Sequence, residues 1–477
     1  MIIFYIIAPI VLALAYYYNL YILVYAVFLL FFINFYSSFT ARPNNKMAFA
    51  IGVFLLIHNS WLISLHQWVG SISSYLILFG FTLYFFIIIY VFIWVLGFFK
   101  RLPGSEFLIP TIWVVFELVL TLGPFGYPLF SIYITQAYSP YLFLSHNIVG
   151  AELISFLVIF TAAFTARVIK SKNSGVMKIT QLFLPGFLFV FIFTYGIYIS
   201  KHNQVICNRF LNIIMIQPNI KQSIKMDSQH FYSSFDHYIK LIKLVKKEHK
   251  NIDAIILPET LVPALWENHF RQEFLRQGLL DSELLIFGLP IKRLDKIYNS
   301  ILFYQDGRYQ KEYAKNQLVP FGESMPIPFY KSKTQIYYSE GAVPQSVGLR
   351  SVKYGVTTCF ESAFFKIYRK INNADLFIVL TNDDWFNSWF KELHLRTAIF
   401  RAVEFNKYML FVANTGKTAV ISNTGEIKET LKDNSLAYIS HKVPISIKEQ
   451  HHFMYIILSS VIIILVFISV SIILKFI

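Results

Sequence analysis

Charge is distributed very unevenly along this 477-residue chain, and that distribution limits the folds open to it. Residues 1–200 contain only three acidic and eight basic side chains, and the last 27 residues contain one charged side chain. Residues 201–450 contain 33 basic and 24 acidic side chains, which is ordinary for a water-soluble domain. Only 14% of all residues are charged, against about 25% in soluble proteins. The pattern predicts a membrane part, a soluble part and a membrane tail.

Long apolar segments predict eight transmembrane helices, because about 20 apolar residues cross a bilayer. The segments are Ile2–Tyr18, Leu20–Phe39, Met47–Leu65, Ile72–Phe99, Phe107–Leu122, Ile148–Ala166, Gln181–Ser200 and Phe453–Leu474. The fourth is long enough to tilt or to contain a break. The first lacks a preceding basic residue and a following small-residue cleavage site, so it is not expected to be a cleaved signal peptide. We expect a seven-helix membrane domain at 1–200, a soluble domain at 201–450 and a C-terminal helix at 451–477.

The basic residues outside the soluble part predict its orientation. With a cytoplasmic N-terminus, all nine of them fall on the cytoplasmic side, and the loops on the opposite side contain none. Seven crossings then place residues 201–450 outside the cytoplasm, facing the periplasm in a bacterium, and the eighth returns the C-terminus. The net charge of +15 is explained by these topology signals and by attraction to anionic lipid headgroups, so no nucleic-acid partner is predicted.

Residues 201–450 alternate short apolar runs ending at turn residues with helix-like stretches, which predicts an α/β domain with a buried sheet. The predicted strands are Leu211–Ile216, Ala254–Leu257, Leu284–Phe287, Ser300–Tyr304, Gly355–Thr358, Leu376–Leu380 and Met409–Val412. The predicted helices are His230–His249, Asn268–Gly278, Ser362–Asn372 and Leu393–Asn406. Residues 325–349 are rich in Pro and Gly and are predicted to form a loop.

Three complementary side chains lie at strand ends or in turn-rich loops of this domain. Glu259 follows one predicted strand, Cys359 follows another, and Lys315 lies in a loop. Such strand ends are where α/β sheets present ligand-binding groups. A thiol nucleophile needs a base, a developing oxyanion needs a cation, and the helix predicted after Cys359 would favour the thiolate. Each residue also has an ordinary explanation: a buried small side chain, an acid at a helix start, or a solvated loop lysine.

Other polar residues carry weaker signals. Cys207 is predicted to be structural; a disulfide with Cys359 is conceivable outside the cytoplasm but would remove the nucleophile. Glu117 and Glu152 would be costly in lipid and are therefore functional candidates, although Trp113 and Glu117 share a helical face and packing explains that pair well. The histidines lack metal-ligand spacing, and there is no C-x-x-C or H-E-x-x-H motif. We predict no metal site and no cofactor.

Three local sequences resemble the catalytic motifs of the nitrilase superfamily: Leu257-Pro258-Glu259-Thr260, Lys315-Asn316-Gln317-Leu318-Val319-Pro320-Phe321-Gly322-Glu323 and Cys359-Phe360-Glu361. Together with the predicted spans, they resemble the apolipoprotein N-acyltransferase family of bacterial inner membranes. Further similar stretches are Ile216-Gln217-Pro218-Asn219-Ile220, Tyr298-Asn299-Ser300, Thr381-Asn382-Asp383, Trp385-Phe386, Arg401-Ala402, Glu404, Ala413-Asn414 and Gly416. The resemblance covers nearly the whole chain.

The resemblance implies an eight-helix membrane domain joined to an extramembrane nitrilase-like α-β-β-α sandwich. It implies a triad in which Glu259 is the general base and acid, Lys315 stabilises the oxyanion and Cys359 is the nucleophile. The implied supporting residues are Glu323, Glu361 and Phe360, and the implied substrate-binding residues are Trp385 and Asn382. The chain departs from the family pattern in having Met226 for a Trp, Phe360 for a Tyr, Asn387 for a Gly and Leu120 for an Arg.

The implied reaction is acyl transfer from a membrane phospholipid to the N-terminal diacylglyceryl-cysteine of an apolipoprotein, through a thioester on Cys359 and with ping-pong kinetics. Two aromatic-rich loops, Phe125–Tyr141 and Ile327-Pro328-Phe329-Tyr330, would suit the membrane surface, the second as a lid that excludes water or both merely as anchors. Two alternatives remain: a membrane-tethered nitrilase-type amidase acting on a small C–N substrate, and a transporter or scaffold that has lost catalysis.

Overall fold

The computed structural model describes residues 2–38, 40–66, 70–123, 125–146, 150–202, 207, 209–265, 267–277, 283–306, 308–320, 322–324 and 337–445. The chain divides into two compact units, one of helices and one containing both β-sheets. Residues 123–125 and 204–450 belong to the second unit. The predicted span Phe453–Leu474 and the predicted lid Ile327-Pro328-Phe329-Tyr330 lie outside the described residues.

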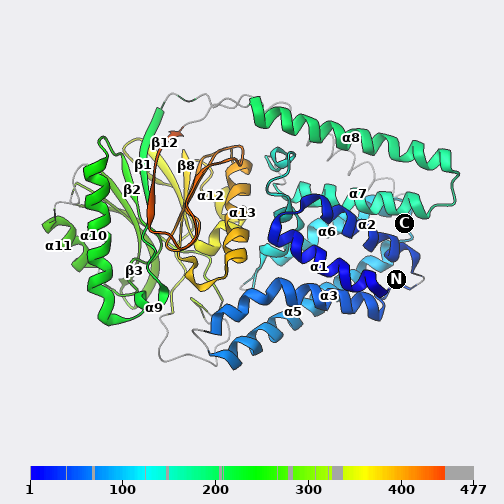
Figure 1. Cartoon of the computed structure of the whole chain (residues 1–477), viewed down its shortest axis with the longest axis horizontal. Helices are drawn as coiled ribbons and strands as arrows, with labels where there is room; N and C mark the ends of the chain where they lie inside the picture. Colours follow the sequence, from blue (N-terminus) through cyan, green and yellow to red (C-terminus); the bar gives the residue numbers. More distant parts are fainter. Residues whose placement is uncertain are drawn as a thin grey trace. The chain divides into compact units, whose positions relative to one another are not determined.

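Each of the seven segments predicted as spans before residue 201 coincides with a helix in the described part of the chain. The helices are α1 (Ile2–Tyr18), α2 (Tyr21–Ser37), α3 (Asn45–His58), α5 (Ser71–Phe99), α6 (Ser105–Leu120), α7 (Glu152–Lys170) and α8 (Gly175–His202) (Figure 1). A short 3-10 turn, η1 (Asn59–Leu65), continues α3. The fourth predicted span is one unbroken 29-residue helix, α5, so it contains no break.

Three of these helical segments are long and apolar enough to cross a membrane by themselves: Asn45–Leu65, Ser71–Phe99 and Glu152–Lys170. The helices α1, α2 and α6 are apolar but have only 17, 17 and 16 residues. That is shorter than the roughly 20 residues that a bilayer requires. A helical region with three candidate spans is therefore established for the described residues, whereas the count of eight remains a prediction.

The aromatic segment Phe125–Tyr141, predicted to suit a membrane surface, has many buried side chains. It forms short turns, among them η2 (Pro128–Phe130) and η3 (Ile132–Gln136), and Tyr127, Phe130 and Tyr133 are buried. The Phe130 ring lies 4.6 Å from the Phe85 ring, centroid to centroid. Most of these rings therefore pack inside the helical unit, and a role of this segment at a membrane surface stays a prediction.

Two six-stranded sheets form the second unit. The first sheet has the order β12-β1-β2-β3-β4-β5, and the second has the order β11-β10-β9-β8-β7-β6. The first contains β1 (Arg209–Gln217), β2 (Ala254–Ile256), β3 (Leu284–Arg293), β4 (Lys296–Gln305), β5 (Arg308–Ala314) and β12 (Ala437–Ile445). The second contains β6 (Val347–Leu349), β7 (Val352–Thr358), β8 (Leu376–Thr381), β9 (Met409–Ala413), β10 (Ala419–Ile421) and β11 (Ile427–Thr430). In both sheets the central strands β1-β2-β3 and β7-β8-β9 are parallel.

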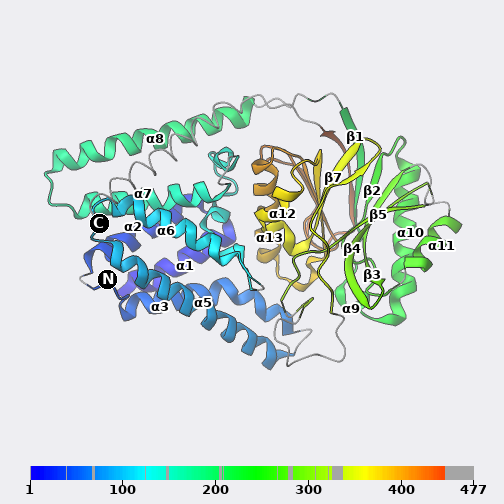
Figure 2. The ribbon, with the colours of Figure 1, turned by 180° about the vertical axis from the view of Figure 1, so that it is seen from behind.

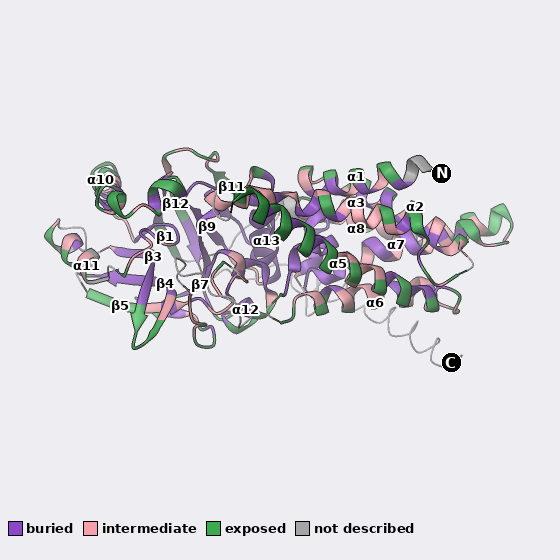
Figure 3. Ribbon diagram, turned by 90° about the horizontal axis from the view of Figure 1, so that it is seen from below, coloured by how far each residue is buried: buried purple, intermediate pink, exposed green. Residues whose placement is uncertain are grey.

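Helices cover the outer face of each sheet. Figures 1 and 2 show α10 (Phe231–Glu248) and α11 (Glu267–Arg276) on one side, and α12 (Phe365–Lys370) and α13 (Ser388–Glu404) on the other. One core cluster joins the facing sides of the sheets, including Ile213, Ile256 and Ile378, and a second joins the first sheet to α10. The central strands are buried in Figure 3. The observed order of layers is therefore α-β-β-α.

All seven predicted strands are present, and β3 and β4 extend well beyond the predicted runs. Five further strands were not predicted: β5, β6, β10, β11 and β12. The predicted helix Ser362–Asn372 is divided at Phe364 into a 3-10 turn, η6 (Cys359–Ala363), and the short helix α12. The helix α13 begins five residues before the predicted Leu393, where the Asn387 side chain accepts a hydrogen bond from Phe390 N–H and caps it.

Candidate active site

Glu259 lies in the turn that follows β2, and not at the start of a helix. The next residue, Thr260, has a left-handed φ of 49°. Gly288 on β3 holds this turn, since its N–H donates to Pro258 and its carbonyl accepts from Leu261 N–H. A Cβ on Gly288 would lie only 2.7 Å from the Glu259 Cα, so a side chain there would collide with the backbone that carries the carboxylate. The glycine therefore permits this close approach.

The Glu259 carboxylate is buried and accepts hydrogen bonds from residues of two other segments. Asn299 Nδ2 on β4 donates to Oε1 at 2.7 Å, and the backbone N–H of Asn382, after β8, donates to Oε2 at 3.0 Å. Lys225 Nζ, from the short helix α9 (Gln222–Lys225), donates to the Glu259 carbonyl oxygen at 3.1 Å. These contacts orient both the side chain and the backbone of Glu259.

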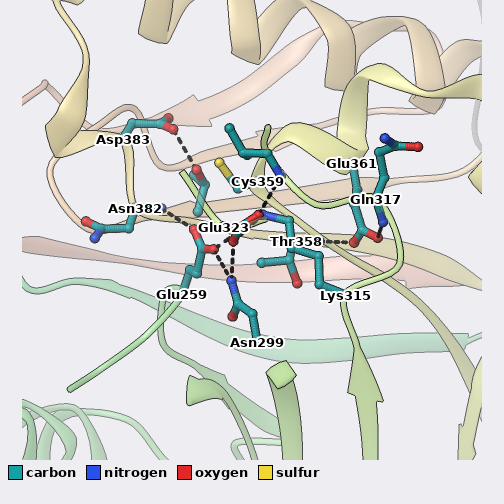
Figure 4. Close-up of polar contacts among 12 residues, drawn as sticks. Glu259, Asn299, Lys315, Gln317, Glu323, Thr358, Cys359, Glu361, Asn382 and Asp383 are labelled. Carbon is teal, nitrogen blue, oxygen red and sulfur yellow. Dashed lines mark hydrogen bonds and ion pairs between the residues drawn. The ribbon is translucent and has the colours of Figure 1, made fainter. Parts of the chain in front are cut away.

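Lys315 directly follows β5, and its side chain is only 1% exposed. Its Nζ lies 2.8 Å from Glu323 Oε2 and 3.7 Å from Glu259 Oε1. Asn299 Nδ2 also donates to Glu323 Oε1 at 2.8 Å, so one amide links the two carboxylates. Figure 4 shows these side chains converging beside Cys359. The ammonium is held by ion pairs and is not a solvated loop lysine.

Cys359 follows β7 and is the first residue of η6. Its φ is 49°, a left-handed conformation that is uncommon for residues other than glycine, and its side chain is buried. Both Cys359 and Cys207 are free thiols, so the two cysteines form no disulfide in the structure. The parallel pairing of β7 with β8 brings this turn next to residues 381–383.

Glu361 joins the lysine segment to the cysteine segment. Its carboxylate accepts the Tyr313 hydroxyl, the backbone N–H groups of Asn316 and Gln317, and the Thr358 N–H. The contact with Thr358 N–H is 2.8 Å and belongs to a capping box around the start of η6. The single buried carboxylate of Glu361 thus fixes the residues that flank both Lys315 and Cys359.

Burial and neighbouring charges shift the pKa values of Glu259, Lys315 and Cys359 in defined directions. Burial raises the pKa of Glu259 above its ordinary value, although the Lys315 charge opposes the shift. Burial alone would lower the pKa of Lys315, but the Glu323 and Glu259 carboxylates outweigh it and raise that pKa. Burial also raises the pKa of the Cys359 thiol well above its usual range, with a further contribution from Glu259. The cysteine therefore rests as a thiol.

This last direction corrects the expectation that a following helix would favour the thiolate. The element after Cys359 is a five-residue 3-10 turn, and removal of the sulfur from water dominates its pKa. A neutral thiol needs a base at the moment of attack. The neighbouring Glu259 carboxylate, with its own raised pKa, is suited to take that proton.

The remaining predicted site residues have different surroundings. Phe360 is half-buried and its ring lies 5.0 Å from that of Phe364. Asn382 is buried; besides its backbone contact with Glu259, its side chain donates to Gln222 Oε1 and accepts from Asn414 Nδ2. Asn382 therefore belongs to the surroundings of the base. Trp385 is half-buried, in the short turn that follows Asn382.

Three residues of the site have no role in the sequence-based prediction. Asn299 and Tyr313 appear there only within short stretches around predicted site residues, and His394 only within the predicted helix Leu393–Asn406. His394, on α13, contacts both Asp383 and the Cys359 carbonyl oxygen. The sequence signal for this part of the site was the short polar run after β8, because functional groups often lie at the ends of strands. No comparable signal pointed to His394, which lies inside an otherwise ordinary helix.

Among the described residues, one cluster brings together side-chain atoms of the kinds that bind metal ions. The Cys359 sulfur, an Asp383 carboxylate oxygen and a His394 ring nitrogen all lie within 4.8 Å of one another. Both ring nitrogens of His394 already have protein partners, Asp383 Oδ1 and the Cys359 carbonyl oxygen. The protein's own hydrogen bonds thus account for the arrangement of this group.

Glu117 and Glu152, the acids suspected within the apolar part, belong to the helical unit. Both are buried. Glu117 Oε1 accepts from Trp113 Nε1 at 3.1 Å and from Ile132 N–H at 2.9 Å. The predicted i,i+4 contact with Trp113 is therefore present, and Glu117 also anchors the turn η3.

The site as a whole can carry out covalent acyl chemistry. It places a thiol, a carboxylate able to accept its proton and an ammonium able to stabilise an oxyanion in one buried cluster. The same set serves acyl transfer and hydrolysis of a C–N bond, because both proceed through a tetrahedral intermediate on the sulfur. The second substrate decides between them.

Comparison with known proteins finds relatives that are named acyltransferases. The profile of the carbon-nitrogen hydrolase family matches residues 215–448, and that of the apolipoprotein N-acyltransferase N-terminal domain matches residues 8–164. An apolipoprotein N-acyltransferase of Aquifex aeolicus is 29% identical over 348 residues, covering 67% of this chain and 75% of the relative. Apolipoprotein N-acyltransferase 1 of Treponema denticola is 27% identical over 449 residues, covering 82% and 80%.

Among solved structures, Nit3 of Saccharomyces cerevisiae, a member of branch 10 of the nitrilase superfamily, is 18% identical with a TM-score of 0.40. It covers 50% of this chain and 91% of its own. A carbon-nitrogen hydrolase from Helicobacter pylori is 14% identical with a TM-score of 0.41, covering 49% and 89%.

Proposed function

Because the chain belongs to the apolipoprotein N-acyltransferase family, we propose that it transfers an acyl chain from a phospholipid to the N-terminal diacylglyceryl-cysteine of apolipoproteins. This is the last step of lipoprotein maturation. The observation that carries the proposal is the buried cluster of Glu259, Lys315 and Cys359, in a chain whose N-terminal part matches the acyltransferase domain.

In the first half-reaction, Glu259 accepts the thiol proton while the Cys359 sulfur attacks the ester carbonyl of the phospholipid. Lys315 and backbone N–H groups stabilise the oxyanion. When the tetrahedral intermediate collapses, the ester C–O bond breaks, and the lysophospholipid oxygen takes the proton from Glu259. An acyl-thioester remains on Cys359. The raised pKa of Glu259 supports this exchange, since the group must both accept and return a proton.

In the second half-reaction, the neutral α-amino group of the apolipoprotein cysteine attacks the thioester. Glu259 takes the proton that the amine loses as the amide forms, and returns it to the departing sulfur. Two substrates that use one covalent carrier in turn give ping-pong kinetics. The carrier must be shielded from water, because hydrolysis would release the acyl chain. The burial of Cys359 supports this requirement.

The proposed reaction is tested by looking for the acyl group on the sulfur. After exposure of the purified protein to phospholipid with a labelled acyl chain, the Cys359 peptide should gain the acyl mass, and added apolipoprotein should remove it. The Cys359→Ala variant should carry no label. The matched control is Cys207→Ala, which removes the other free thiol and should label like the parent protein.

An unlabelled Cys359 in folded protein would remove the acyltransferase proposal and favour an amidase with a small C–N substrate. A thioester that forms but is released only to water would contradict transfer to an apolipoprotein. Normal lipoprotein N-acylation in cells that carry only the Cys359→Ala variant would instead indicate a scaffold.

We further propose that residues 1–200 supply seven membrane spans, 201–450 form the periplasmic catalytic domain, and 451–477 form the eighth span of an inner-membrane protein. The apolar helices of the first part and the one-sided basic residues support this arrangement. Both substrates are anchored in lipid, which explains why a catalytic domain would be tethered at both ends.

This topology predicts which parts of the chain are accessible from outside. A membrane-impermeant lysine reagent applied to intact spheroplasts should label the exposed Lys240 in the catalytic domain but not Lys475 near the C-terminus. Permeabilised membranes, in which both lysines should react, provide the control. Labelling of Lys475 in intact spheroplasts would contradict the eighth crossing.

A further inference from the structure

His394 is a buried, polar contact of the nucleophile that the proposed mechanism does not use. It lies on α13 with 3% exposure, and its two ring nitrogens meet two different partners. Nε2 is 2.9 Å from the carbonyl oxygen of Cys359, and Nδ1 is 3.1 Å from Asp383 Oδ1. The ring therefore bridges the backbone of the nucleophile to the polar run after β8.

These partners determine where the ring protons lie. A carbonyl oxygen can only accept, so Nε2 carries a hydrogen and donates it to Cys359. An ionised Asp383 also only accepts, so Nδ1 then carries a hydrogen as well, and the ring is an imidazolium. Burial opposes charge on both groups, but their attraction prevails: the pKa of His394 is raised and that of Asp383 is lowered. The ring thus has no free lone pair to act as a base toward the sulfur.

The backbone of Cys359 needs such an anchor. A left-handed φ of 49° is strained in a residue with a Cβ, and it persists only when the surroundings hold it. On the N-terminal side, Glu361 accepts the Thr358 N–H. On the C-terminal side, His394 holds the Cys359 carbonyl. The turn that aims the sulfur is therefore fixed from both sides by buried, charged groups.

Asp383 is itself held in place. Its Oδ1 also accepts the Thr381 hydroxyl at 2.6 Å, and the same hydroxyl contacts the Cys359 side chain. A Cβ on Gly416 would lie 3.0 Å from Asp383 Oδ2, so the turn after β9 closes the other side. Other charges that act on this pair come from Glu259 and from Lys391 on α13, and the Phe411 ring packs against His394. The pair has little freedom to move.

We propose that His394 is a positioning residue for the nucleophile: anchored by Asp383, its Nε2–H holds the Cys359 carbonyl and fixes the left-handed turn that directs the sulfur toward Glu259 and Lys315. The inference rests on the proposed acyl transfer through Cys359 and adds a residue to it. The general base remains Glu259, because both nitrogens of the ring are engaged elsewhere.

Two amide variants separate this role from simple packing. The side-chain nitrogen of Gln reaches the place of His Nε2, whereas the shorter Asn reaches only the place of Nδ1. In a Cys207→Ala background, we expect His394→Gln to keep the acylation rate within about 10-fold and His394→Asn to lose about 100-fold, as for a misplaced reacting group. The loss should appear in kcat for acyl-enzyme formation, with rates expressed per folded molecule.

A second readout does not depend on the acyltransferase activity. Alkylation of Cys359 by iodoacetamide should slow in the same order, parent, Gln, then Asn. If the parent forms no acyl-enzyme while this order holds, the proposed function fails and the positioning role stands. Equal rates per folded molecule in both variants, whether normal or reduced, would overturn the positioning role.

Substitution of the buried His394 could prevent folding, so a third variant tests the proposal in that case. Asp383→Asn keeps the size of the side chain but removes the charge that holds the imidazolium. If His394→Asn does not fold, Asp383→Asn should still show slower alkylation and acylation of Cys359 than the parent. Parent-like rates in folded Asp383→Asn would overturn the proposal.

Discussion

Replacement of Lys315 with Met should lower the rate of acyl-enzyme formation by about 100-fold to 1,000-fold, because loss of one oxyanion donor raises the barrier by about 2.7–4 kcal/mol. It should also destabilise the catalytic domain. The Lys315 side chain is 1% exposed, and its Nζ lies 2.8 Å from Glu323 and 3.7 Å from Glu259. Without the ammonium, two neighbouring carboxylates remain buried, a situation that costs about 3–5 kcal/mol.

The destabilisation should depend on pH in a defined direction. Loss of the positive charge removes a contribution that lowers the pKa of Glu259, so in the variant the folded-state pKa of that carboxyl rises further above its unfolded value. A folded state that binds more protons loses stability as the pH rises. The thermal midpoint of Lys315→Met should therefore fall further below that of the parent in mildly alkaline than in mildly acidic buffer.

Thermal unfolding at two pH values and single-turnover acylation together check this prediction. The matched control is Lys240→Met, which removes an exposed lysine paired with Asp236 on the surface of α10. An exposed pair of this kind contributes roughly 0–1 kcal/mol. A Lys315→Met protein with parent-like stability and rate would show that the ammonium neither neutralises the carboxylates nor assists the reaction.

Replacement of Glu259 with Gln should lower the acylation rate by about 100-fold to 10,000-fold, the range that a positioned general base contributes. The amide cannot take the thiol proton. It also places an NH2 donor against one of the two groups that now donate to the carboxylate, Asn299 Nδ2 and Asn382 N–H. Since burial raises the pKa of Cys359, little thiolate is present at neutral pH to compensate.

The pH profile gives this prediction a distinct signature. Because burial raises the pKa of Glu259 above 4.5, the parent should lose kcat/KM as the pH falls through that raised value, when the base becomes protonated. Glu259→Gln should lack this acidic limb. Its matched control is Glu426→Gln, which changes a carboxylate that is 59% exposed and should leave the profile intact. An acidic limb that persists in Glu259→Gln would assign it to another group.

Much of the fold follows from local features of the chain. The apolar runs ending at turn residues predicted the central strands, such as β1 and β8, because a strand covered on both faces must be apolar along its length. The strands that were missed are short or lie at the edges of the sheets. Four of the seven residues of β5 are charged or strongly polar: Arg308, Gln310, Lys311 and Glu312. Of the seven, only Tyr313 is buried. Such an edge strand is defined by its pairing with β4 and not by its composition.

In the apolar N-terminal part, too, the sequence predicted the elements but not all of their packing. Composition identified every α-helix that the structure describes before residue 201, but not how the aromatic side chains between α6 and α7 are used. Tyr127, Phe130 and Tyr133 are suitable both for a membrane interface and for a core. Only the packing of these rings against α5 and its neighbours shows that they are buried.

The sequence by itself separated an apolar part from a part with ordinary charge content, and it singled out Glu259, Lys315 and Cys359 as candidates, because charge content and short motifs are local properties. Only the tertiary structure decided what surrounds these groups. Asn299 and His394 come from distant segments, so their contacts exist only once β4 and α13 are packed. The raised pKa of Cys359 is likewise a result of burial, and burial depends on every element that covers the sulfur.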